Sequence, residues 1–138
     1  MKFLLDNDVF LSAIYRKHES HAGSRAWLDA AKREGWGIAA ETYLAAIRLL
    51  MNPSVMGSGA FTAHRALDAV DAELAGSHPG QVVMAQRKPD RRLLERAEGH
   101  RQVMDIWLLQ IARDSGSRLA TRDAGILSLW PEDSQKVP

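Results

Sequence analysis

The sequence predicts an α/β domain in which a short, mainly parallel sheet lies between layers of helices. Short apolar runs alternate with longer amphipathic segments, the order typical of parallel strands joined by helices. The 138 residues correspond in length to a single domain, 1–138, and the 46% that are hydrophobic can fill one core. Neither a repeat nor a low-complexity linker interrupts this order.

The expected strands are apolar runs that end in polar loops. Phe3-Leu4-Leu5 is stopped by two acids, and Arg118-Leu119-Ala120-Thr121 leads into Arg122-Asp123. The full set is 3–5, 36–40, 81–84 and 118–121, with at most a short strand at 136–137.

The expected helices are segments with apolar residues at helical spacing and a recognisable start or stop. Asp8 is available to cap the first, Gly35 ends the second, and Asn52-Pro53 stops the third. The apolar stripe of 60–74 fits core packing and a dimer face equally well. The full set is 9–15, 19–34, 41–51, 60–74, 89–98 and 103–113.

The composition excludes several classes of protein. There is no cysteine, so a disulfide scaffold and thiolate-bound zinc or iron–sulfur sites are excluded. The net charge of +1 excludes a histone-like binder, although it allows a local basic surface. No apolar run is long enough to span a bilayer, and an acid at position 6 is unlike a signal peptide. We therefore expect a cytoplasmic protein that does not enter a membrane.

Carboxylates follow the predicted strands or begin the predicted helices. Asp6 and Asp8 follow the first strand, Glu41 the second and Asp123 the fourth, while Asp105 lies in the first turn of an apolar helix. Parallel strands bring their carboxyl ends to one edge, where sites form. An oxygen-only ligand set suits Mg²⁺ or Mn²⁺, which can activate water for phosphodiester cleavage.

Each acid also has a structural interpretation. Asp8 and Asp123 fit helix N-caps, and Asp105 and Glu41 fit the acidic first turn that a helix dipole favours. Asp6 has no such local explanation in the sequence.

Four motifs, in order along nearly the whole chain, resemble those of PIN-domain nucleases of the VapC toxin type. Leu4-Leu5-Asp6-Asn7-Asp8-Val9-Phe10-Leu11 resembles the opening strand motif, and Arg48-Leu49-Leu50-Met51-Asn52-Pro53 the end of the central helix. Gly99-His100-Arg101-Gln102-Val103-Met104-Asp105 resembles the third-acid motif, and Arg118-Leu119-Ala120-Thr121-Arg122-Asp123 the fourth.

The resemblance implies a three-layer α/β/α PIN fold and an Mg²⁺- or Mn²⁺-dependent endoribonuclease that leaves a 3′-hydroxyl and a 5′-phosphate. It implies Asp6 and Asp105 as principal metal ligands, Asp123 as the acid that completes the site, and Thr121 as a supporting hydroxyl. It also implies an RNA substrate (a tRNA or another structured RNA), a VapB-type antitoxin and a homodimer.

The chain departs from the family pattern at two positions. The second acid of the family, a Glu, falls on Tyr43, and Glu41 lies two residues earlier, roughly 200° around a helix. Asp8 stands where the family usually has Asn. One hypothesis is that Asp8 or Glu41 restores the missing carboxylate. The rival is a catalytically weakened PIN domain that serves as an RNA- or antitoxin-binding module.

Basic side chains close to these motifs are candidates for RNA binding. Arg16 and Arg122 follow acid-bearing loops, and Arg101 precedes Asp105, so all three are candidates for phosphate contacts. His18 and His21 have the spacing of a metal-binding pair, but a solvated helix start is the preferred interpretation.

Overall fold

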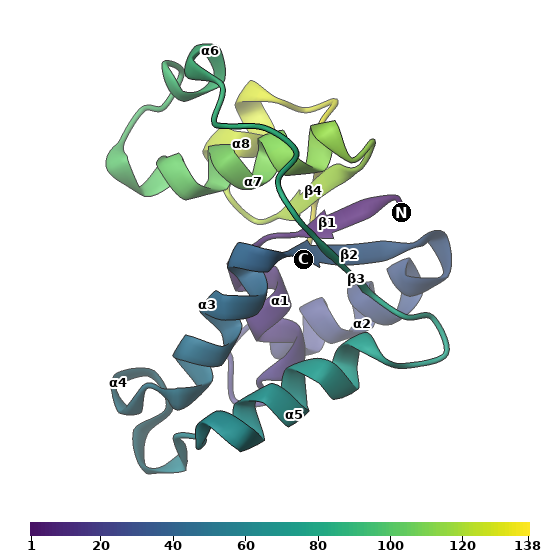
Figure 1. The fold of residues 1–138 in the computed structure, drawn as a ribbon, viewed down its shortest axis with the longest axis vertical. Helices are drawn as coiled ribbons and strands as arrows, with labels where there is room; N and C mark the ends of the chain where they lie inside the picture. Colours follow the sequence, from purple (N-terminus) through teal and green to yellow (C-terminus); the bar gives the residue numbers. More distant parts are fainter.

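The computed structural model describes residues 1–138 as three layers, with a parallel sheet between two layers of helices (Figure 1). The strands are β1 (Phe3–Leu5), β2 (Trp36–Ala39), β3 (Gln81–Val83), β4 (Arg118–Thr121) and β5 (Ser134–Lys136), in the order β3-β2-β1-β4-β5. Every neighbouring pair is parallel. The predicted three-layer α/β/α class is confirmed.

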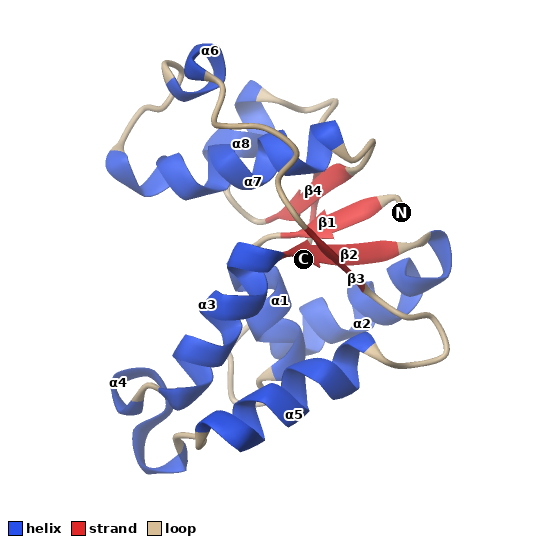
Figure 2. Ribbon diagram, in the orientation of Figure 1, coloured by secondary structure: helices blue, strands red, loops and turns tan.

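The helices cover both faces of the sheet (Figure 2). One layer holds α1 (Asn7–Ile14), α2 (His21–Ala31), α3 (Ala40–Met51) and α5 (Ala63–Leu74), and the other holds α6 (Arg91–Leu94), α7 (Val103–Asp114) and α8 (Ala124–Leu129). A short α4 (Pro53–Met56) follows α3, and single turns of 3-10 helix lie at Lys32–Glu34, Gly57–Gly59 and His100–Gln102. No helix combines the length and apolarity needed to cross a membrane.

Successive residues of the central strand supply two separate cores. Phe3 and Leu5 pack into a cluster with α1, α2, α3 and α5, whereas Leu4 packs into a second cluster with α7 and α8. This alternation is the period of a strand, whose side chains point to opposite faces in turn. Because both faces are covered, β1 is apolar at every position and buried throughout.

The structure corrects several predicted boundaries. The helix expected over 60–74 begins at Ala63, because the hydroxyl of Thr62 accepts a hydrogen bond from the Arg65 N–H and caps it there. The helix expected over 89–98 is limited to Arg91–Leu94, with Asp90 as its cap. The last strand is Ser134–Lys136 rather than 136–137. The sequence analysis did not predict α4. For α8 it predicted only that Asp123 could be a helix N-cap.

The order of the strands determines where a site can form. β1 lies between β2, which follows it in the chain, and β4, which begins only at Arg118. The carboxyl ends of β1 and β4 therefore meet where the connections diverge in opposite directions, the usual position of a binding crevice in an open parallel sheet.

Candidate active site

Asp6 directly follows β1 and is fixed at the carboxyl edge of the sheet. Its backbone N–H donates to the Ala120 carbonyl of β4 at 3.1 Å. Its carboxylate accepts a hydrogen bond from the Val9 N–H at 2.7 Å and caps α1. The expectation that Asp8 caps this helix was wrong, because α1 begins at Asn7, two residues before the predicted start at Val9.

Asp123 holds the equivalent position after β4. Its carboxylate accepts from the Ile126 N–H at 2.7 Å and caps α8. The buried hydroxyl of Thr121 accepts from the Asp123 N–H at 3.0 Å, which ties the end of the strand to the start of the helix. Asp123 is therefore both a helix cap and a residue of the sheet edge.

The structure brings most of the predicted acids into one cavity of about 370 Å³. Asp105 reaches it from the first turn of α7. None of the lining residues is hydrophobic; they are Asp6, Asn7, Asp8, Asp105, Arg122 and Asp123. We call this space the acid cavity.

Two of these carboxyls are held protonated to unusually high pH. Burial is the main cause that raises the pKa of Asp6 to about 6, against the opposing effect of hydrogen bonds from the Thr121 hydroxyl and the Val9 N–H. Burial also raises the pKa of Asp105 to about 6, and the charges of Asp6 and Asp123 add to this rise. The cavity therefore concentrates negative charge that a bound cation would neutralise.

The donor set of the acid cavity fits Mg²⁺ or Mn²⁺. All its potential ligands are oxygens, and hard cations of this kind are bound by one or two carboxylates together with retained waters. The Asp105 carboxylate accepts no hydrogen bond from the rest of the chain, so its oxygens are available. No three His, Asp or Glu side chains are arranged to hold an ion by themselves. The fit is therefore to an ion that keeps part of its water shell.

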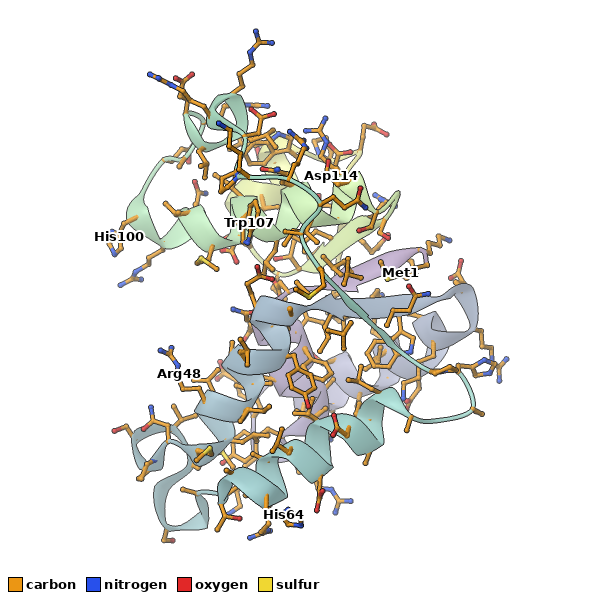
Figure 3. All side chains as sticks on the ribbon, in the orientation of Figure 1. Met1, Arg48, His64, His100, Trp107 and Asp114 are labelled. Carbon is orange, nitrogen blue, oxygen red and sulfur yellow. The ribbon has the colours of Figure 1, made fainter.

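Glu41 lies outside the acid cavity, in the first turn of α3. One carboxylate oxygen accepts a hydrogen bond from the Trp107 indole N–H of α7 at 3.1 Å, and the other is buried without a partner. Trp107 is labelled on α7 in Figure 3. Tyr43 faces away, toward α5, where its hydroxyl donates to Asp71 at 2.8 Å. Glu41 and Tyr43 thus point in different directions, as their separation on a helix predicts.

Two of the predicted RNA-binding arginines are also absent from the acid cavity. Arg16 lines a separate, largely apolar cavity of about 260 Å³ beside Tyr15 and Phe61. Arg101 is exposed in the 3-10 turn before α7, next to His100 at the outer end of its layer (Figure 3). Of the three, the structure brings only Arg122 to the acids.

The structure also adds one residue that sequence reasoning missed, and it gives partners to the two histidines that were considered. Asn7 lines the cavity and accepts a hydrogen bond from the Thr42 hydroxyl at 2.7 Å; its position between two acids was the available signal. His18, expected to be solvated, lies 3.1 Å from a carboxylate oxygen of Asp8 through its Nε2 atom. His21 bonds the Ser12 carbonyl oxygen through Nδ1 at 2.8 Å.

Comparison with known proteins identifies related chains that match most or all of this chain. Ribonuclease VapC38 of Mycobacterium tuberculosis is 34% identical over 128 residues, which cover 91% of this chain and 88% of that protein. Ribonuclease VapC29 of the same species is 28% identical over 143 residues, which cover 100% of this chain and 98% of that protein. No protein-family profile matches.

One solved structure has the same fold. A chain in the crystal structure of VapBC2 from Rickettsia felis, bound to a DNA fragment from the promoter, superimposes with a TM-score of 0.69. The match covers 100% of both chains at 12% sequence identity, so it supports the architecture alone.

Proposed function

The chain belongs to the VapC family of PIN-domain ribonucleases, and from this premise we propose that it is an Mg²⁺- or Mn²⁺-dependent endoribonuclease, the toxin of a VapBC-type module. The observation that carries the proposal is the acid cavity, to which Asp6, Asp105 and Asp123 come from three separate elements. The high pKa of two of these acids supports a site built to bind a cation.

In this proposal Asp6, Asp105 and Asp123 hold the ion. When bound, the ion supplies an activated water and stabilises the leaving oxygen of the phosphodiester. Asp6 and Asp123 each use one oxygen to cap a helix, which fixes the direction of the carboxylate. The Thr121 hydroxyl links the two acids, since it bonds to the Asp123 N–H and lowers the pKa of Asp6.

Cleavage of labelled RNA tests the proposal directly. Purified protein is incubated with a tRNA and with an unstructured oligonucleotide in Mg²⁺, Mn²⁺ or EDTA, and the product ends are analysed. We expect 5′-phosphate products with either metal, none in EDTA, and loss of cleavage by more than about a hundredfold in Asp105→Asn. The matched control is Asp114→Asn at the other end of α7, where the carboxylate pairs with Arg87 outside the cavity.

A catalytically weakened binding module is the second candidate. Two observations favour it: Glu41 is engaged with Trp107, and no three acids form a complete cage. RNA binding without cleavage in either metal, identical in the wild type and Asp105→Asn, would establish it in place of the nuclease.

The partners form a further part of the proposal. The structural neighbour belongs to a VapBC assembly, which supports a VapB-type antitoxin as the partner of this chain. A homodimer, a structured RNA such as tRNA as substrate, and a cytoplasmic location complete the proposal. Co-expression with a candidate antitoxin followed by size-exclusion chromatography tests both the antitoxin complex and the homodimer.

A further inference from the structure

Arg122 lies at the wall of the acid cavity and is held by groups from three parts of the chain. Its Nη1 donates to the Asp8 carboxylate at 2.7 Å, and its Nε to the Pro138 carbonyl at 2.9 Å. Its Nη2 donates to the Ser12 hydroxyl at 3.2 Å and also to the Ser24 hydroxyl. A guanidinium has five N–H groups. These contacts occupy four of them and leave one N–H on Nη1.

The Asp8 carboxylate binds this arginine and is itself held by His18. One of its oxygens accepts from Arg122, and the other lies 3.1 Å from Nε2 of His18. The Nδ1 atom of His18 accepts the Ser20 N–H at 3.0 Å, so the ring proton is on Nε2 and is donated to Asp8. Each oxygen of Asp8 therefore already has a hydrogen-bond partner that ties it to Arg122 or His18, whereas the Asp105 carboxylate has none.

We propose that Asp8 and His18 position Arg122 so that its free N–H binds a non-bridging phosphate oxygen of RNA, and that Asp8 is not a metal ligand. The inference rests on the proposed function and divides the cavity into two parts. Asp6, Asp105 and Asp123 form the cation side, and Arg122 forms the anion side.

Electrostatics gives this division its physical reason. A cavity lined by carboxylates repels the phosphodiester that must enter it. A guanidinium offsets this repulsion and suits phosphate because its donors are planar and permanently charged. The tertiary contacts of Arg122 fix the group before the substrate arrives, so little conformational entropy is lost on binding.

The salt dependence of RNA binding separates this role from a purely structural one. The affinity of a fluorescent single-stranded RNA is measured by anisotropy in EDTA, where no cleavage occurs, over a range of salt concentrations. Loss of one phosphate contact lowers the slope of log K against log salt by about 0.7 and weakens binding about tenfold. We expect both changes in Arg122→Gln and retention of the slope in Arg122→Lys.

Arg118→Gln is the matched control for this experiment. Arg118 begins β4, the strand that directly precedes Arg122, and bonds Gln135 and the Pro131 carbonyl, outside the acid cavity. We expect the slope of this variant to equal that of the wild type. Thermal unfolding of each variant establishes that it is folded. If Arg122→Gln does not fold, Arg122→Lys is compared with the wild type instead.

Calorimetric titration with Mn²⁺ in the absence of RNA tests the assignment of Asp8. We expect Asp8→Asn to keep its Mn²⁺ affinity within about threefold, and Asp105→Asn to lose more than about tenfold. An equal loss in both variants overturns the assignment of Asp8. An unchanged salt slope in Arg122→Gln, or no binding of RNA by the wild type in EDTA, overturns the phosphate contact. If the wild type binds RNA but does not cleave it, the proposed nuclease activity is refuted and the proposed phosphate contact of Arg122 is not.

Discussion

Replacing Asp6 with Asn is expected to stabilise the metal-free protein while removing one of the proposed metal ligands. The Asp6 residue is only 5% exposed, and its pKa rises from 3.8 to about 6. A rise of about two units corresponds to about 3 kcal/mol of unfavourable free energy when the buried carboxyl is ionised. Asn is as good a helix cap as Asp, so the bond from the Val9 N–H is retained. We expect the free energy of unfolding at pH 8 in EDTA to increase by about 2 kcal/mol.

The pH dependence of this effect has a defined sign. Between pH 4 and pH 6 the folded wild type binds more protons at Asp6 than the unfolded chain does, because the folded pKa is the higher one. Its stability therefore falls as the pH rises through this window and stays lower above it. Asp6→Asn loses this contribution, so the two proteins differ least below pH 4.

Urea unfolding followed by tryptophan fluorescence measures the effect, at pH 4.5 and pH 8 with EDTA. Asp68→Asn is the control, because the Asp68 side chain is 70% exposed and lies outside the cavity. Adding Mn²⁺ should stabilise the wild type more than Asp6→Asn, by binding to the folded state alone. Equal or lower stability of Asp6→Asn at pH 8 in EDTA would refute the burial argument.

Three other predictions follow from contacts described above. Trp107→Phe removes the only donor to Glu41 and should lower the free energy of unfolding by about 1–3 kcal/mol. Adding Glu41→Gln to this variant should recover part of the loss. A change below about 0.5 kcal/mol in Trp107→Phe would count against the contact. Gly37→Ala brings a Cβ to 2.6 Å from a main-chain oxygen of β3 and should cost about 1–3 kcal/mol in urea unfolding, whereas Gly59→Ala, with open space around it, should cost less. Mn²⁺ affinity measured by calorimetry should rise from pH 5.5 to pH 7.5, because the two proposed ligands with a pKa of about 6, Asp6 and Asp105, must lose their protons. A flat profile would contradict this.

Local sequence patterns were sufficient to predict the fold class and most of the elements. Arg118–Thr121 was predicted with its observed bounds, because a short apolar run there is enclosed by Ser115-Gly116-Ser117 and by an acid. The start of α1 was harder to predict. Asp6-Asn7-Asp8 offers two possible caps, and the choice of Asp6 depends on its anchoring to Ala120 of β4. No local pattern contains that information.

The same limit applies to the acid cavity. Asp6, Asp105 and Asp123 were predicted because each follows a strand or opens an apolar helix. Two of the partners of Arg122, Ser24 in α2 and Ser12 in α1, lie 98 and 110 residues away, so sequence reasoning found the arginine but not what holds it. Glu41 was a candidate by proximity to a strand end, yet its direction depends on Trp107, 66 residues later.

The central position of β1 has a consequence for the synthesis of the protein. β1 is synthesised before β4, which is one of its two neighbours in the sheet and begins at Arg118. A growing chain that ends before residue 100 contains Asp6 but neither Asp105 nor Asp123, and one whole edge of β1 is unpaired. Pairings between residues so distant in sequence form late and slowly. The acid cavity is thus completed only after β4 and Asp123 have been synthesised, and Asp6 remains without the full set of acids of the site until then.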